Sequence, residues 1–354
     1  PPPVHGASIM NDNLINGEIV NKHFDLIVVK LQFLKSIDDI SRFSFRKLFK
    51  AFGIGFEIIR KIFTQKPDLV YLTFATKGFA LFRDLGYAFL VKILGKRIVF
   101  HLHEKGIKSG SKKSRFKKLL YWKAFKNESV ICISEKVVPE IEDVYKEAPY
   151  IVPNGIRFYK HSGGKEKAGT ESIPRILFLS NYMLNKGILT LIDAIEILKN
   201  KGYNLNARLV GGPIDFTKEN LQKIIDGKKI SGCVQITGPL YNDDKISELK
   251  NADIFVLPSK SEAFPLVILE AMQFSLPVVS TFEGGIPEMV ADNETGFLVE
   301  PDNTEELAEK IGILLDNKDL RTTMGKKGFE RYKGNYTVEI FENNMIKTFD
   351  KILK

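Results

Sequence analysis

Cysteine, histidine and long apolar runs are all scarce in this 354-residue chain, and each scarcity excludes a class of protein. The two cysteines, Cys132 and Cys233, lie far apart in apolar runs, so we interpret them as buried thiols in a reducing compartment. No apolar stretch reaches the roughly 18 uninterrupted residues that a membrane-spanning helix requires, and nothing resembles a secretory signal. These absences predict a cytoplasmic protein.

Two further absences argue against redox and metal chemistry. No Gly-x-Gly-x-x-Gly follows a first strand, so dinucleotide oxidoreduction has no support. Among the five histidines, His101 and His103 share one face of an expected strand end, but the others show no ligand spacing relative to them. We therefore expect no metal and no cofactor.

What the composition offers is a globular chain with a divided charge. Hydrophobic residues make up 44% and charged residues 27%, and the length allows two domains. Residues 1–160 hold 28 lysines and arginines against 15 acidic residues, a net +13, whereas residues 161–354 hold 24 against 28, a net −4. A basic first half indicates an anionic partner such as a membrane surface, a phosphate-bearing acceptor or nucleic acid; the alternative is a solvated lysine-rich surface.

Short apolar runs alternate with helical patterns throughout the chain. The expected strands are residues 25–31, 69–74, 98–103, 130–134 and 150–153, then 175–180, 207–210, 234–237, 254–257, 277–280 and 297–299. Such alternation predicts parallel sheets covered by helices on both faces, hence an α/β fold with two doubly wound, Rossmann-like domains. The boundaries that we predict are a domain at 1–160, a Gly-, Lys- and Ser-rich linker at 161–172, a domain at 173–334 and a final helix at 335–354.

Two stretches of the first half combine aromatic and basic residues. Residues 44–63 place phenylalanines at helical spacing among lysines and arginines, and residues 112–126 repeat this double character. A basic helix with one aromatic face can lie in a membrane interface. The same stripe can equally face the sheet as core.

Two glutamates stand in the most informative stretch of the chain. Pro265 predicts a helix that starts near it and ends near Gln273, which puts Glu262 in the preceding loop and Glu270 inside an apolar helix. At about 1.5 Å per residue the two carboxylates lie roughly 10 Å apart, far enough to hold both ends of an elongated polar ligand. In the simpler alternative Glu270 caps a neighbouring loop and Glu262 is solvated.

Two loops add candidate phosphate sites. Gly284 and Gly285 lead into a helix with Pro287 in its first turn, and Lys186 lies beside the start of another helix at Gly187. Backbone amides and a cation at helix starts bind anions. Carboxylates for hydroxyl groups and amides for phosphate are together what a sugar nucleotide requires.

The stretch from Ser259 to Pro287 resembles the signature of the retaining glycosyltransferases of family 4, which have the GT-B fold. The family motif is a glutamate, seven residues and a second glutamate, and Glu262 and Glu270 match it. The resemblance implies two facing Rossmann-like domains with the site in the cleft, and a last helix that crosses back onto the first domain. It also implies that Glu262 contacts the transferred sugar and Glu270 the ribose.

Further roles come from the same resemblance. Lys186 would contact the leaving diphosphate, assisted in the family by an arginine at the position of Asn181, and His103 matches a catalytic-site histidine. The other implied donor-binding positions are Gly6, Gly238, Leu240, Phe264, Pro265, Leu266, Gly284 and Gly285. In the family a strand precedes the loop of Gly6, and this chain shows none before it.

The sequence thus predicts a retaining, metal-independent glycosyltransferase of the hexosyltransferase type. Its donor is a UDP- or GDP-linked sugar and its acceptor a glycan or lipid-linked glycan, in bacterial surface polysaccharide biosynthesis. We expect cytoplasmic localisation with peripheral attachment to the inner face of the membrane, and no nucleic-acid partner. The alternatives are a nucleotide-sugar epimerase of the same fold and a basic module that binds lipid or nucleic acid.

Overall fold

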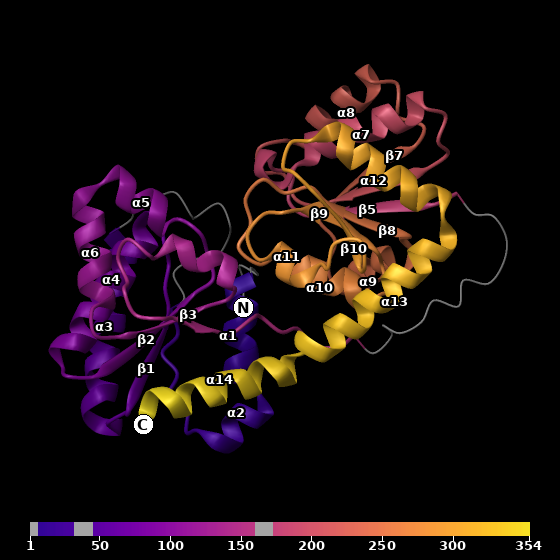
Figure 1. Ribbon diagram of the computed structural model, residues 1–354. Helices are drawn as coiled ribbons and strands as arrows, with labels where there is room; N and C mark the ends of the chain where they lie inside the picture. The colour runs from indigo at the N-terminus through magenta and orange to yellow at the C-terminus, as the bar shows by residue number, and fades with distance from the viewer. Residues whose placement is uncertain (1–5, 32–44, 160–172) are drawn as a thin grey trace. The chain divides into compact units, whose positions relative to one another are not determined.

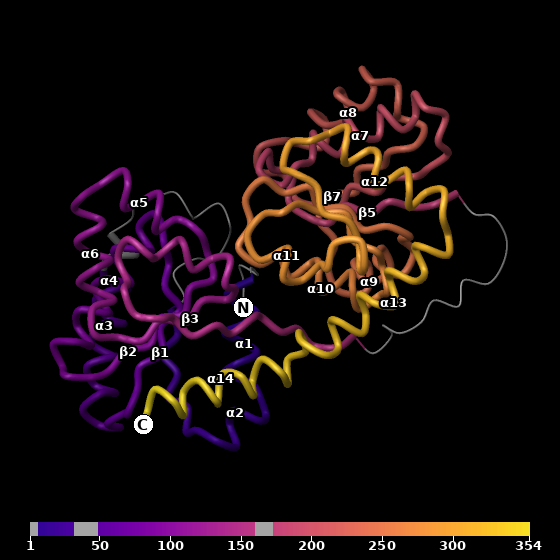
Figure 2. Tube along the Cα trace, in the orientation of Figure 1, coloured from indigo at the N-terminus to yellow at the C-terminus, as the bar shows by residue number. Residues whose placement is uncertain are grey.

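The structure, a computed structural model, describes residues 6–31, 45–159 and 173–354. The chain divides into two compact units, each with its own sheet (Figures 1 and 2): unit 1 contains residues 1–155 and 338–354, and unit 2 contains residues 156–337. The expected linker at residues 161–172 lies outside the described residues.

Unit 1 is built on a four-stranded parallel sheet whose order follows the chain, β1-β2-β3-β4. Its strands are β1 (Leu69–Thr73), β2 (Arg97–Leu102), β3 (Ser129–Cys132) and β4 (Tyr150–Ile151). The helices between them are α4 (Gly78–Ile93), α5 (Ile107–Lys113) and α6 (Arg115–Phe125), and a 3₁₀ helix spans Glu135–Glu140. Burial of both sheet faces explains the nearly continuous apolar runs of β2 and β3.

One expected strand of this unit is wrong. Residues 25–31 have the β-branched composition of a strand, yet their backbone is irregular and makes no ladder with β1 or any other described strand. Lys61 instead donates to the carbonyl oxygen of Val28 at 2.6 Å. Strand propensity reflects the fit to a pleated neighbour, so it does not suffice where no neighbour pairs.

The last helix, α14 (Val338–Leu353), packs in unit 1 against α1 (Gly6–Ile15) and α2 (Glu18–His23). The buried carboxylate of Glu342 accepts hydrogen bonds from the backbone N–H groups of Ile19 at 2.9 Å and Val20 at 3.2 Å. These amides would otherwise be unpaired at the start of α2, so Glu342 joins the two ends of the chain.

The helix α3 (Phe45–Gln65) precedes β1 and corrects one expectation. The side chains of Ile54 and Ile62 are buried, whereas Phe49, Phe52 and Phe56 stand in solvent. The interpretation of the phenylalanine stripe as core is therefore wrong for the phenylalanines from residue 49 onwards; the isoleucines on the opposite face of the helix form the core contact.

Unit 2 is built on a six-stranded parallel sheet in the order β10-β9-β8-β5-β6-β7. Its strands are β5 (Arg175–Leu179), β6 (Asn206–Val210), β7 (Val234–Gly238), β8 (Ile254–Leu257), β9 (Val278–Thr281) and β10 (Gly296–Val299). Its helices are α7 (Ile188–Asn200), α8 (Lys218–Gly227), α9 (Asn242–Asn251), α10 (Leu266–Gln273), α11 (Ile286–Met289), α12 (Thr304–Asp316) and α13 (Lys318–Asn335). Because the strand order reverses between β5 and β8, a crevice for a ligand is expected at the carboxyl ends of these two strands.

Candidate active site

The loops that follow β5 and β8 carry the first two candidate residues. The loop after β5 contains the 3₁₀ turn Leu184–Lys186, and the loop after β8 contains Glu262. Since β5 and β8 pair directly, their carboxyl ends lie side by side. The reversal of strand order therefore brings together two residues that are 76 positions apart.

Lys186 and Glu262 form an ion pair at these strand ends, from Nζ to Oε1. Ser259 supports the pair, because its hydroxyl group donates to the carbonyl oxygen of Asn185 at 2.9 Å and lies 3.3 Å from the same Glu262 oxygen. The Glu262 side chain is 10% exposed and the Lys186 side chain is 21% exposed, so both charged groups are partly desolvated. Such a pair offers one cation and one hydrogen-bond acceptor to a polar ligand.

Two glycines allow the surrounding backbones to touch. Gly187 has φ 72°, and a Cβ atom there would lie 1.9 Å from the carbonyl oxygen of Pro258. Gly284 has φ 53°, and its Cβ atom would lie 2.1 Å from the carbonyl oxygen of Glu262. Each position therefore requires glycine for two reasons: its backbone is left-handed, and a neighbouring carbonyl group lies too close for a Cβ atom.

The loop of Gly284 differs in one respect from the expected phosphate nest. The N–H group of Gly285 donates to the carbonyl oxygen of Ala263 at 2.8 Å, so this amide is already engaged. The bond joins the loop after β9 to the loop after β8. Gly285 thus positions the loop of Glu262, and its amide does not offer the expected free donor to a diphosphate.

Glu270 lies on α10, the helix that connects β8 to β9. The helix begins at Leu266 with Pro265 as N-cap and ends at Gln273, as the sequence predicted, and it places the carboxyl group of Glu270 in a buried environment. Its Oε1 atom accepts hydrogen bonds from Lys245 Nζ at 2.7 Å and from the hydroxyl group of Tyr159 at 3.1 Å. Its Oε2 atom is buried and has no partner among the described residues.

The environment of Glu270 perturbs both of its donors. Burial tends to lower the pKa of Lys245, but the charge of Glu270 and the hydrogen bonds to Glu270 and Tyr159 outweigh burial and raise that pKa above its ordinary value. Burial, together with the Glu270 charge, raises the pKa of Tyr159. Lys245 therefore stays cationic and Tyr159 stays neutral, and both donate hydrogen bonds to Oε1. Oε2 can also accept a hydrogen bond, but none of the described residues donates one to it.

Sequence reasoning missed both of these donors. Lys245 lies in α9 among Asp243, Asp244 and Asn242, a composition that only suggests a solvated helix. Tyr159 directly precedes the polar stretch that was expected to be a linker. Neither shows a spacing signal, because the contacts are separated by 25 and 111 positions in the chain.

Gln273 fixes the segment that carries Tyr159. Its side-chain oxygen accepts a hydrogen bond from the backbone N–H of Tyr159 at 3.0 Å, and its NH₂ group donates to the carbonyl oxygen of Arg157 at 2.9 Å. Glu270 and Gln273 are three positions apart and share a helix face. Residues 157–159 are therefore bonded along one face of α10.

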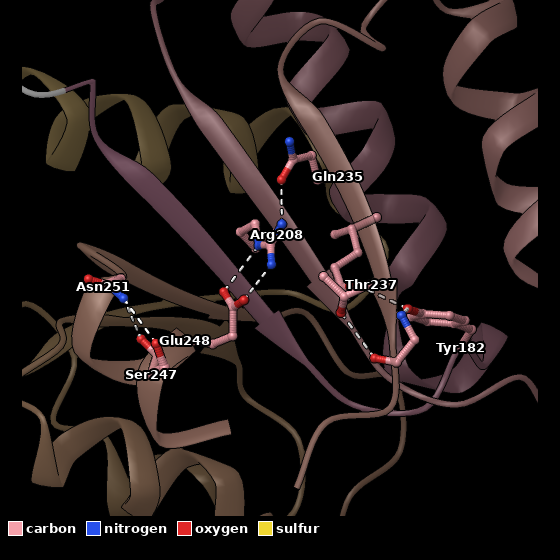
Figure 3. Close-up of polar contacts among 9 residues, drawn as sticks. Tyr182, Arg208, Gln235, Thr237, Ser247, Glu248 and Asn251 are labelled. Atoms are coloured by element: carbon pink, nitrogen blue, oxygen red, sulfur yellow. Dashed lines mark hydrogen bonds and ion pairs between the residues drawn. The ribbon is translucent and has the colours of Figure 1, made fainter. Parts of the chain in front are cut away.

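A second ion pair anchors α9 to the sheet (Figure 3). Arg208 on β6 binds Glu248 on α9 with two N–H groups, of which Nε lies 3.1 Å from Oε2, and its third contact is the side-chain oxygen of Gln235 on β7. Glu248 is buried and lies three positions after Lys245, hence about one helical turn away. The bidentate pair thus fixes the helix that presents Lys245 to Glu270.

The loops after β6 and β7 are organised by a buried tyrosine, also drawn in Figure 3. The hydroxyl group of Tyr182 accepts from the N–H of Gly238 at 3.1 Å and donates to the carbonyl oxygen of Leu209 at 3.0 Å. Burial raises the pKa of Tyr182 and keeps it neutral. Asn181 accepts from the N–H of Gly212 at 3.2 Å, which directs its amide oxygen to the loop after β6.

The remaining donor-binding candidates occupy different environments. Phe264 and Leu266 are buried, and Phe264 meets the ring of Tyr336 edge-on with centroids 5.9 Å apart. Leu240 is half-buried after β7, and Pro265 is the buried N-cap of α10. Phe264 and Leu266 thus act first as packing that fixes the loop of Glu262.

In unit 1, His103 directly follows β2 and lies beside His101, with ring centroids 4.0 Å apart. The Nδ1 atom of His101 is 2.8 Å from the hydroxyl group of Tyr71, and burial, together with His103, lowers the pKa of His101 well below its ordinary value. His101 is therefore neutral. Gly6 is the first residue of α1 rather than part of a described loop.

Among the residues that the structure describes, no three His, Cys, Asp or Glu side chains are grouped in a way that could hold a metal ion. The candidate site consists of two lysine cations, Lys186 and Lys245, each paired with a carboxylate, Glu262 and Glu270 respectively. This donor set suits hydroxyl groups and phosphate.

Comparisons with known proteins agree with this chemistry. Residues 165–331 match the family model of the glycosyl transferases group 1. The chain is 26% identical to an uncharacterized glycosyltransferase of Methanocaldococcus jannaschii, over 88% of this chain and 81% of that protein. It is 28% identical to the capsular polysaccharide biosynthesis glycosyltransferase CapM of Staphylococcus aureus, over 64% of this chain and 62% of the relative.

A similar solved structure is that of HepE from Anabaena in complex with UDP. Its TM-score is 0.71 at 20% identity, over 84% of this chain and 82% of that chain. This likeness confirms the predicted fold class, an α/β fold of GT-B type with two parallel-sheet domains.

Proposed function

We propose that the chain is a retaining, metal-independent glycosyltransferase that moves a sugar from a UDP- or GDP-linked donor to a glycan or lipid-linked glycan. The observation that carries the proposal is the arrangement of three side chains at the point where the strand order reverses. Lys186 and Glu262 form an ion pair there, and Glu270, on the helix that follows, has a buried oxygen to which none of the described residues donates. A nucleotide sugar has the phosphates and hydroxyl groups that match these groups.

Lys186 would bind the diphosphate. In the described structure its charge is neutralised by Glu262. An incoming diphosphate carries more negative charge than one carboxylate, so it would replace Glu262 as the partner of the lysine. Because negative charge grows on the diphosphate as the sugar leaves, Lys186 stabilises the transition state more than the bound donor.

Glu262, once released by Lys186, would accept hydrogen bonds from hydroxyl groups of the transferred sugar. Glu270 would accept one from a ribose hydroxyl group through Oε2, the buried atom that has no hydrogen-bond partner in the described parts of the chain. Asn181 has its amide oxygen engaged by Gly212, so its NH₂ group would be the end that donates to a phosphate. His103 and Gly6 stay predicted contacts of the sugar and acceptor.

The acceptor class is proposed on other grounds. CapM, a relative of this chain, is named for capsular polysaccharide biosynthesis. The first half of the chain carries the net +13, which suits an anionic lipid-linked acceptor at the inner face of a membrane. A nucleotide-sugar epimerase of the same fold is the alternative, and product analysis without an acceptor distinguishes the two.

The proposal is tested with a panel of UDP- and GDP-sugars, by measuring release of the nucleoside diphosphate and the anomeric configuration of the product by NMR. Lys186→Ala is expected to lower kcat at saturating donor by about 100-fold, the usual loss for one group that stabilises transition-state charge. The matched control is Lys201→Ala, which removes an exposed lysine after the other end of α7. Wild-type turnover in Lys186→Ala, or an inverted product, would overturn the proposal.

A further inference from the structure

The helix α3 exposes a row of phenylalanines, which we call the phenylalanine ridge: Phe49, Phe52, Phe56 and Phe63. Their exposed fractions are 76%, 71%, 70% and 65%. Steps of three, four and seven residues place all four on one face of a helix. Exposed apolar side chains are normal when single, but four aligned phenylalanines exposed to this degree indicate a binding surface.

The ridge is not the face by which α3 packs in its unit. Ile54 and Ile62, on the opposite side of the helix, are buried, and the hydroxyl group of Tyr87 on α4 donates to the carbonyl oxygen of Ala51 at 3.0 Å. The fold thus uses one apolar face of α3 for its core and presents a second apolar face outward. Folding alone requires only the first.

The neighbouring helices also expose apolar side chains. Helix α4 packs against both α3 and α6, and the three lie over the same side of the sheet in Figure 1. Helices α4 and α6 also expose large apolar side chains, namely Phe79, Phe82, Ile93, Phe116, Leu119 and Trp122. More than half of the exposed large apolar side chains among the described residues therefore belong to these three helices.

The same helices are strongly basic. Helices α3 to α6 contain fourteen lysines and arginines but only two acidic residues, Glu57 and Asp84. Asp84 is buried and paired with Arg83, and Glu57 pairs with Lys61, so neither offers an isolated negative charge to a partner. Aromatic side chains between cations are the composition of an interfacial membrane helix.

We propose that the phenylalanine ridge inserts into the headgroup and acyl boundary of an anionic bilayer, while the lysines of α5 and α6 contact the lipid headgroups. The ridge covers residues 49–63, which is about 21 Å of helix at 1.5 Å per residue, so α3 lies in the plane of the surface. Among the described residues, no helix is both long and apolar enough to cross the bilayer. That this surface gives access to a lipid-linked acceptor rests on the proposed function. The proposed binding to the bilayer does not depend on that function.

Charge favours a bilayer over a second copy of the chain as the occupant. A two-fold dimer through the ridge would bring together two copies of the same basic surface, since symmetric interfaces use the same patch on both subunits. Like charges across such an interface repel. An anionic bilayer instead complements the fourteen cations and accepts the phenylalanines.

The test is co-sedimentation with vesicles, without nucleotide sugar or acceptor. Vesicles of phosphatidylglycerol and phosphatidylcholine are compared with phosphatidylcholine alone, at low and high salt. We expect binding to the anionic vesicles that weakens with salt, and a loss of about 100-fold in the partition coefficient for the double variant Phe52→Ser and Phe56→Ser, about tenfold for each side chain. The matched control Ile313→Ser, an exposed apolar residue of α12, is expected to bind as the wild type does.

Charge is tested separately with the quadruple variant Lys112→Glu, Lys113→Glu, Lys117→Glu and Lys118→Glu, which is expected to abolish the preference for anionic vesicles. Wild-type protein that stays in the supernatant at low salt overturns the proposal, as does equal binding by the ridge variant. A concentration-dependent dimer in sedimentation velocity that the ridge variant abolishes would reassign the ridge to self-association. Donor hydrolysis in lipid-free solution reports on the proposed function, so the two failures are distinguishable.

Discussion

Replacing Lys245 with methionine tests the network around Glu270 directly. Methionine keeps most of the volume of the lysine stem but removes the ammonium group that donates to Glu270 Oε1 at 2.7 Å. The buried carboxylate then keeps only the Tyr159 hydroxyl group, at 3.1 Å. We therefore expect a lower stability of unit 2 and a less well-fixed position of Oε2.

The magnitude follows from the burial of the two partners. Removing one partner of a fully buried ion pair costs about 3 to 5 kcal/mol. The Glu270 side chain is only 8% exposed, but that of Lys245 is 23% exposed, and Tyr159 still donates; we therefore expect a loss of about 2 kcal/mol in the free energy of unfolding. For a domain of this size the melting temperature falls by roughly 2 to 4 °C per kcal/mol, hence by about 4 to 8 °C.

Ligand affinity separates a positioning role from a purely structural one. If Lys245 holds Glu270 so that Oε2 meets a ribose hydroxyl group, Lys245→Met weakens UDP or GDP binding by about tenfold, since a hydrogen bond to a charged group contributes about 1.5 to 3 kcal/mol. Calorimetry and thermal melts measure the two effects. Lys250→Met, an exposed lysine on the same helix, is the control, and Lys245→Arg should retain affinity. A lower melting temperature with unchanged nucleotide affinity would refute the positioning role.

Two further predictions concern stability. Arg208→Met leaves the buried carboxylate of Glu248 without its bidentate partner, so chemical denaturation should show a loss of about 3 kcal/mol; a loss below 1 kcal/mol would mean that the pair does not anchor α9. The raised pKa values of Lys245 and Tyr159 mean that the folded state holds both protons more tightly than the unfolded state. Stability is therefore expected to fall as pH rises above about 10, and less steeply in Tyr159→Phe, as urea titrations from pH 8 to 11 would show.

The parts of the fold that follow from local pattern were predictable. Pro265 and the apolar run after it predicted α10 from its first turn to Gln273, and the buried strands of both sheets follow their apolar runs. These elements are specified by residues within a few positions of one another. The strand predicted at residues 25–31 is wrong because a strand also needs a neighbouring strand to pair with, and local composition does not supply one.

The site residues that belong to a contiguous sequence motif were predictable, and those brought to the site only by the fold were not. Glu262 and Glu270 fall within one segment, and Lys186 lies at a recognisable helix start. Lys245 and Tyr159 reach Glu270 only through the folded sheet, so no spacing in the sequence reports them. The amide of Gly285 was assigned to a ligand because a glycine loop before a helix suggests a nest, whereas tertiary contact with Ala263 occupies it.

The glycine contacts at the candidate site also limit how this protein could diversify. A side chain at Gly187 or Gly284 would have to push away the backbone of Pro258 or Glu262, because its first carbon would already overlap a carbonyl oxygen. Such a change would separate the loops that pair Lys186 with Glu262. Variation at the candidate site is therefore expected at the neighbouring side chains, while Gly187 and Gly284 are expected to stay constant because the backbone contacts leave no room for a Cβ atom.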